Sequence, residues 1–203
     1  MSFVSQYSYN IHTTMIKEAV TQFPVLDLIK KRWSARSFSP KAIAPEDVKT
    51  ILEAASWAAS ANNEQPWEYI YAHKGTAGFD TIWNCLMQGN QPWNKKAAVL
   101  IVAIARKTLA ANGNPNTYAE HDLGMANAHL LLQASAMGIY SHPMAGIDKA
   151  KLVESLKLIE NQYPACIIAL GYLDDAEKLE EPYKERELTP RTRKPLSEFV
   201  KEL

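Results

Sequence analysis

The sequence predicts a layered α+β domain, in which helices pack on a central sheet. Two observations support this fold class. Apolar strand-like runs alternate along the chain with helix-like segments that carry an apolar face. Hydrophobic residues make up 47% of the 203 residues, which is enough for a substantial core. We therefore expect a single domain over residues 1–203, with an N-terminal extension over 1–23 and a C-terminal arm over 174–203.

The first part of the chain is predicted to form two helices and a strand. Residues 24–31 are typical of a short helix, with proline near the first turn and lysines at the end. A second helix begins at Pro45, carries apolar residues on one face and ends near Ser60. Residues 66–72 are rich in aromatic and branched side chains and indicate a strand that enters the core.

The later elements follow the same alternation. A helix over 79–88 precedes residues 97–105, whose continuous apolar run is expected of a strand buried on both faces. Residues 119–137 form the longest predicted helix, which is apolar almost all round and should be central or at a subunit interface. Residues 164–172 are a third apolar strand. The charged, proline-rich remainder is either disordered or an arm that lies on another surface.

Charge and cysteine content exclude several classes of function. Lys and Arg total 22, as do Asp and Glu, so no overall basic field favours nucleic acid or an anionic membrane. Cys85 and Cys166 are far apart and form no Cys-x-x-Cys motif, and the histidines lack metal-ligand spacing, so we predict no metal. The absence of a signal-like start or a membrane-length apolar run predicts a cytoplasmic protein.

The run Arg32-Trp33-Ser34-Ala35-Arg36 is a candidate phosphate grip. On an extended backbone, alternate side chains point to the same side, so both arginines and the serine would face one ligand. Guanidinium groups offer paired, charge-assisted donors that match phosphate oxygens. The alternative is a solvated basic face that complements the preceding helix dipole.

The second candidate is Ser60-Ala61-Asn62-Asn63-Glu64-Gln65-Pro66-Trp67, which stands just before a predicted strand. Amide side chains both donate and accept hydrogen bonds, so Asn63 and Gln65 suit a heterocycle with a polar edge. The alternative is an ordinary turn before proline.

Further motifs follow in a fixed order: Gly89-Asn90-Gln91-Pro92-Trp93, Asp122 to Leu130, Pro143-Met144-Ala145-Gly146-Ile147-Asp148, Gly171-Tyr172, and Arg191 to Leu196. From about residue 24 to the C-terminus, this ordered series resembles the FMN-dependent nitroreductase family. The resemblance implies a central mixed or antiparallel sheet flanked by helices, and a homodimer with FMN sites at the subunit interface. It also implies that NADH or NADPH reduces FMN at N5. A nitroaromatic or quinone-like acceptor would then enter the same cavity and take the electrons from the reduced FMN.

The resemblance assigns cofactor-binding roles by position. Arg32, Ser34, Arg191 and Arg193 would hold the FMN phosphate and the neighbouring ribityl hydroxyls. Arg36 would lie toward N1 and the C2 carbonyl, where a cation favours the anionic reduced flavin and raises its reduction potential. No catalytic acid or base is expected, since the flavin carries the chemistry.

Two further segments would complete the site. Asn63 and Gln65, with Ser60 beside them, would bind the flavin edge from the partner subunit. In the turn that contains Pro143, Met144, Ala145 and Gly146, the backbone N–H groups of the last two would face N5 and O4. Gly146 would let the backbone approach closely. His142 and Glu64 are possible modulators beside the flavin and the substrate pocket.

The chain also departs from the family pattern. Trp33 stands where a second arginine or a polar residue is common, and Ala59 and Ala61 replace proline and serine. Glu64 either faces solvent or repels anionic substrates, and residues 106–122 lack the longer insertion of some members. Alternatives are therefore a different flavin reaction, such as dehalogenation or dehydrogenation, and a flavin-binding protein without turnover.

Overall fold

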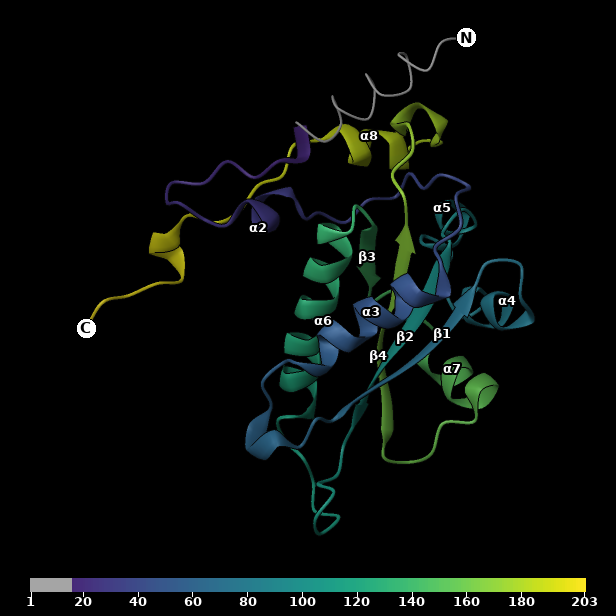
Figure 1. The fold of residues 1–203 in the computed structure, drawn as a ribbon, viewed down its shortest axis with the longest axis vertical. Helices are drawn as coiled ribbons and strands as arrows, with labels where there is room; N and C mark the ends of the chain where they lie inside the picture. Colours follow the sequence, from purple (N-terminus) through teal and green to yellow (C-terminus); the bar gives the residue numbers. More distant parts are fainter. Residues whose placement is uncertain (1–15) are drawn as a thin grey trace.

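Four antiparallel strands form the centre of the computed structural model, which describes residues 16–203 (Figure 1). The strand order is β1-β2-β4-β3. The strands are β1 (Trp67–His73), β2 (Val99–Arg106), β3 (Tyr140–Met144) and β4 (Gln162–Gly171). The predicted α+β class with a mixed or antiparallel sheet is confirmed, and the sheet is antiparallel throughout.

Strand β2 lies at the middle of the sheet, as its continuous apolar run predicts. Its residues Val99–Ala105 are fully buried, and Val102 pairs with Ile70 of β1 and Ile167 of β4. The register with β4 shifts between Ala103 and Ile104, where Pro164 enters the ladder. Proline has no N–H to donate, so an irregularity there is expected.

Helices cover both faces of the sheet. On one face, α3 (Pro45–Ser56) and α6 (Ala119–Ala136) pack against the sheet in one apolar cluster. The opposite face is covered by α4 (Ala77–Trp83), α5 (Gln91–Asn94) and α7 (Lys149–Leu156). None of the described helices is long and apolar enough to cross a membrane.

Helix α6 has the central position that its composition predicts. Its large apolar side chains are buried or partly buried, whereas small ones such as Gly124, Ala128 and Ala136 are exposed. In Figure 1 the helix runs along the sheet with its start at the lower end and its end near α2 (Asp27–Lys31). The outward face of α6 can therefore approach another backbone closely.

Strand β3 and helices α5, α7 and α8 were not predicted from the sequence. Strand β3 contains Pro143, the first residue of the predicted turn, and proline is tolerated there since β3 lies at the sheet edge. Helix α7 is capped by Asp148, whose side chain accepts a hydrogen bond from the Lys151 amide at 3.0 Å. Helix α8 (Tyr183–Leu188) lies within the predicted arm.

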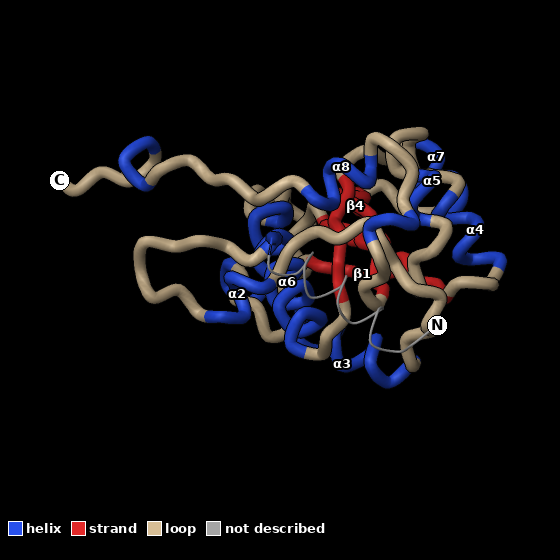
Figure 2. Tube along the Cα trace, turned by 90° about the horizontal axis from the view of Figure 1, so that it is seen from above, coloured by secondary structure: helices blue, strands red, loops and turns tan. Residues whose placement is uncertain are grey.

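The predicted arm consists of two parts. Residues up to Leu188 pack on the rest of the domain. The Asp174 amide donates to the Ser37 carbonyl at 2.9 Å, and the adjacent Leu173 forms an isolated antiparallel β-bridge with Phe38. Beyond Leu188 the chain extends away from the sheet (Figure 2). The sequence left two alternatives for residues 174–203, disorder or an arm lying on another surface. The second alternative describes the part up to Leu188. The predicted extension over 1–23 falls largely outside the described residues.

Candidate functional site

The segment from Arg32 to Arg36 has the extended, alternating form that the sequence predicts. Arg32, Ser34 and Arg36 are half-buried on one side, while Trp33 and Ala35 are buried on the other. The Trp33 ring lies edge-on to the Tyr140 ring, with centroids 5.7 Å apart. Trp33 therefore occupies an inward position, and its presence does not remove a cation from the ligand side.

Three arginines from distant parts of the chain come together beside this segment. Burial lowers the pKa of Arg32, and the positive charge of Arg193 lowers it further. The pKa of Arg191 is also lowered, first by burial and then by Arg32 and Arg193. One nitrogen of Arg191 donates to the carbonyls of Lys17 and Lys30, at 3.0 and 2.9 Å. Within residues 16–203 none of the three guanidinium groups has an acidic partner, so the cluster is suited to an anion.

Arg36 lies further along the same segment. Its guanidinium is 5.8 Å from the centroid of the Trp93 ring. Burial lowers the pKa of Arg36, and the carboxylate of Glu187 acts in the opposite direction. The sequence did not identify Glu187 or Lys17, because both contact this segment only through the tertiary fold.

His142 connects β3 to the arginine segment. Its Nδ1 is 2.9 Å from the Ala35 carbonyl oxygen and therefore donates to it, and its ring centroid is 4.5 Å from that of Trp93. Burial is the main cause that lowers the pKa of His142 to about 4, with Arg36 contributing. The ring is neutral at pH 7, and these contacts favour a positioning role over a substrate contact.

The buried neutral His142 should make stability depend on pH. The pKa is about 4 in the folded protein and near 6.5 when unfolded, so the unfolded chain binds more protons between these values. The contribution of neutral His142 to the free energy of unfolding is complete above pH 6.5 and is lost as pH falls toward 4. From pH 7 to 5 we expect a loss of about 2 kcal/mol in the free energy of unfolding. Urea denaturation of wild type and His142→Gln should show this loss in wild type alone; parallel pH profiles would refute it.

The turn after β3 presents backbone donors. Among the described residues, the N–H groups of Ala145 and Gly146 have no hydrogen-bond acceptor. The Gly146 carbonyl accepts from the Met87 amide and from Asn90 Nδ2, both at 3.1 Å. A Cβ at Gly146 would lie 2.8 Å from Asn90 Nδ2. The turn is thus fixed through its carbonyl side, and its amides remain available.

The residues before this turn were also predicted at the cofactor. Met144 is buried, and Asn94 Nδ2 lies 2.9 Å from its sulfur, whereas Pro143 is exposed. Met144 therefore anchors the end of β3 in the core. Pro143 presents its ring on the surface beside the turn.

The amide-rich loop has unusual backbone geometry. Asn62, Asn63 and Gln65 have φ values of 52°, 58° and 48°, in the left-handed region that residues other than glycine rarely adopt. Ser60 Oγ accepts a hydrogen bond from the Gln65 amide at 3.0 Å. All three strained residues are exposed. Such strain clusters at functional sites. Gln65 Nε2 donates to the Asn63 carbonyl at 3.0 Å, and both side chains remain exposed to a partner outside the chain.

This loop lies far from the arginine cluster in the same chain. The Ala61 amide donates to Asp122 at 2.9 Å, at the start of α6, whereas Leu28 of α2 lines a groove with Ala136 at its end. Roughly 20 Å of helix separates the two positions. The two groups occupy opposite ends of α6 in Figure 1. A single chain therefore does not bring the two predicted motifs into one site.

Glu64 has a structural partner. Its Oε2 accepts a hydrogen bond from the Ala110 amide at 3.0 Å. Ala110 belongs to the short segment after β2, which an isolated bridge between Thr108 and Pro115 closes. Glu64 thus links the amide-rich loop to this segment.

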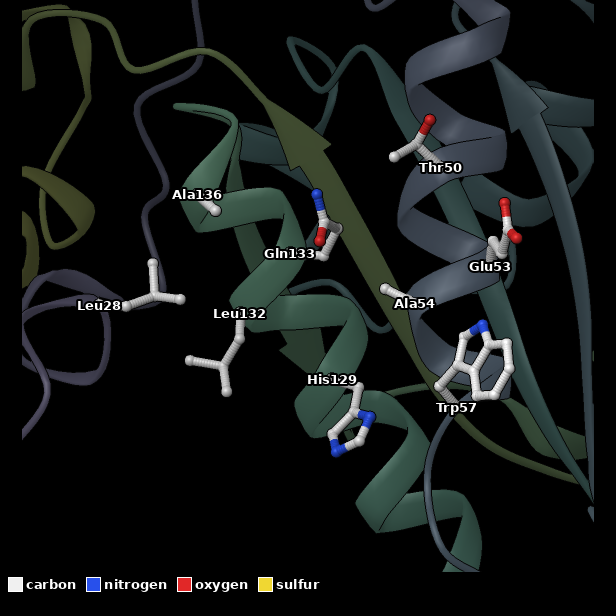
Figure 3. A pocket seen from close by; sticks show the side chains of 9 residues that line it. All are labelled: Leu28, Thr50, Glu53, Ala54, Trp57, His129, Leu132, Gln133 and Ala136. Carbon is white, nitrogen blue, oxygen red and sulfur yellow. The ribbon is translucent and has the colours of Figure 1, made fainter.

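An exposed groove of about 480 Å³ runs between α3 and α6 (Figure 3). Trp57, at the end of α3, is 79% exposed and lies on the wall of the groove. Apolar surface of this kind commonly marks a protein interface. The lining residues are Leu28, Thr50, Glu53, Ala54, Trp57, His129, Leu132, Gln133 and Ala136.

The chain matches known proteins over most of its length. The model of the nitroreductase family matches residues 29–87 and 78–172. A protein of Archaeoglobus fulgidus, named for a proposed NADH dehydrogenase or NAD(P)H nitroreductase activity, is 31% identical over 74% of this chain and 86% of its own. The crystal structure of an oxidoreductase containing FMN has a TM-score of 0.86 and 37% identity, covering 90% of this chain and 93% of that one. A nitroreductase-type structure with FMN from Desulfovibrio desulfuricans has a TM-score of 0.72 and 24% identity, over 90% of this chain and 98% of that one.

Proposed function

The chain belongs to the nitroreductase family, and from this premise we propose that it is an FMN-dependent NAD(P)H oxidoreductase. Its acceptors would be nitroaromatic or quinone-like compounds. The observation that carries the proposal is the cluster of Arg32, Arg191 and Arg193, which has no acidic partner among residues 16–203.

The residues present fit FMN at its phosphate end. Arg32, Arg191 and Arg193 offer fork-shaped donors, and Ser34 points to the same side of the segment. Burial is the main cause that lowers the pKa of Arg32 and of Arg191, and a phosphate would offset the second cause, the repulsion between neighbouring arginines. These residues would therefore bind and orient the cofactor by its phosphate.

The fit continues at the ring end. The amides of Ala145 and Gly146 are available as donors, and a Cβ at Gly146 would press on the Asn90 side chain that holds the turn in place. Arg36 would supply positive charge beside the ring. When bound, FMN supplies the hydride chemistry, so the chain needs to position and tune it rather than provide an acid or base.

The related proteins support the cofactor and the reductant. The relative with 37% identity is an oxidoreductase containing FMN, and the A. fulgidus relative is named for NADH and NAD(P)H. We extend both properties to this chain because the match spans most of its length.

We further propose that the working form is a homodimer. Asn63 and Gln65 lie at the opposite end of α6 from the arginine cluster, so they would serve the flavin held by the second copy. Helix α6, with its small exposed residues, and the groove beside Trp57 provide an apolar surface that the second copy would cover. Each site would then combine residues of both chains.

Replacing Trp57 by glutamate should break this dimer. The side chain is 79% exposed, so the isolated fold should remain, while a buried charge at the interface would be costly. We expect a monomer in analytical ultracentrifugation and weaker FMN binding. Ile159→Glu is the matched control, because Ile159 is 59% exposed but lies before β4, away from the groove. A dimer that survives Trp57→Glu would rule out this surface.

Anaerobic reduction tests the proposed reaction. NADH or NADPH should bleach the visible band of the FMN-loaded protein, and a quinone or nitroarene should restore it. A yellow protein that neither cofactor bleaches would instead support a flavin-binding protein without turnover. Bleaching without reoxidation by these acceptors would point to a different flavin reaction.

A further inference from the structure

Glu187 is a fully buried carboxylate that binds the backbone of the arginine segment. It lies on α8 and has 0% exposure. Its Oε1 accepts hydrogen bonds from the amides of Arg36 and Ser37, both at 2.9 Å, and its Oε2 is 3.1 Å from the Arg36 amide. One side chain thus fixes the backbone at the residue that would face the flavin ring.

The charge of Glu187 is placed among cations. Burial raises its pKa, while the two amide bonds and the charges of Arg36 and Lys17 oppose this rise. Lys17 is only 6% exposed, and its Nζ donates to the carbonyls of Arg186, at 2.8 Å, and Thr189. Lys17 therefore holds the end of α8 close to the carboxylate. The resulting cluster connects the phosphate side of the site with its ring side.

We propose that Glu187 is a positioning residue for the flavin, which fixes the Arg36 backbone and offsets the positive charge of Arg36. This inference rests on the proposed function. A cation near the N1 side of a flavin stabilises its anionic reduced form, so a buried carboxylate behind that cation weakens the effect. Glu187 should therefore keep the reduction potential of bound FMN lower than Arg36 alone would set it.

Two substitutions of Glu187 separate its charge from its hydrogen bonds to the backbone. In Glu187→Gln, a carbonyl oxygen at the Oε1 position can still accept from both amides, as Oε1 does now, but the charge is gone. We expect the reduction potential to rise and the Kd for FMN to stay within about threefold. In Glu187→Ala, the amides of Arg36 and Ser37 lose their acceptor in a buried position. We expect the Kd for FMN to rise about tenfold or more.

The measurements are FMN titration by flavin fluorescence and the midpoint potential by anaerobic titration against a reference dye. Glu185→Gln is the control, because it removes the same charge from an exposed position on α8 and should leave both quantities unchanged. A Glu187→Gln protein with the wild-type potential would overturn the proposal, and this variant decides it even if Glu187→Ala fails to fold. A wild-type protein that binds no FMN would overturn the proposed function instead.

Discussion

Replacing Arg32 by alanine is expected to raise the Kd for FMN by about ten- to a hundredfold. The change removes a charge-assisted fork from the proposed phosphate site. The Arg32 side chain forms no hydrogen bond or ion pair with another residue between 16 and 203, so the fold should not depend on it. Circular dichroism and the unfolding midpoint of the apoprotein should match wild type.

Lys31→Ala is the matched control for this experiment. Lys31 is the neighbouring cation and is exposed at the end of α2. Its removal tests whether net positive charge alone attracts FMN. Equal FMN affinity in Arg32→Ala and wild type would remove the phosphate assignment, whereas equal losses in both variants would replace it with a general charge effect.

Gly171→Ala should give the largest loss of stability. A Cβ at Gly171 would lie 2.5 Å from Cδ1, 2.8 Å from Cγ and 3.0 Å from Cβ of Phe38. Phe38 has 0% exposure, so its ring cannot move into solvent. Overpacking of this kind costs about 1–3 kcal/mol, and more where the neighbour cannot shift. Because Phe38 continues the arginine segment, FMN affinity should fall as well.

Urea denaturation compares this variant with Gly89→Ala. A Cβ at Gly89 meets nothing within 4 Å, so the control should stay close to wild type in its free energy of unfolding. Equal stability of Gly171→Ala and wild type would show that Phe38 is not tightly held at this position.

Elements whose signal lies within one segment were predictable. Strand β2 is apolar from Val99 to Ala105 because it is buried on both faces, and α6 buries a row of apolar residues against the sheet. The alternation of Arg32, Ser34 and Arg36 likewise indicated an extended backbone, which the burial pattern confirms.

Features that depend on distant contacts were not predictable from residue patterns. Strand β3 is short and contains Pro143, so only its pairing with β4 identifies it. Glu187 stands in a charged tail and gains its position from amides about 150 residues away. The sequence suggests solvent for such a carboxylate, because nothing local to it indicates burial.

The separation of the two motifs is an intermediate case. The order of the motifs along the chain, through its resemblance to a family, placed Asn63 and Gln65 on the partner's flavin. The structure puts their loop and the Arg32 cluster at opposite ends of α6, which is consistent with that role. The length of α6 sets this separation, and neither motif's own residues indicate it.

Titration of the purified apoprotein with FMN tests the central claim most directly. The account predicts a yellow protein that binds one FMN per chain, with flavin fluorescence quenched or shifted on binding and with inorganic phosphate competing weakly. A protein that stays colourless and takes up no FMN, although it is folded by circular dichroism, would contradict the assignment of the arginine cluster and the proposed function with it.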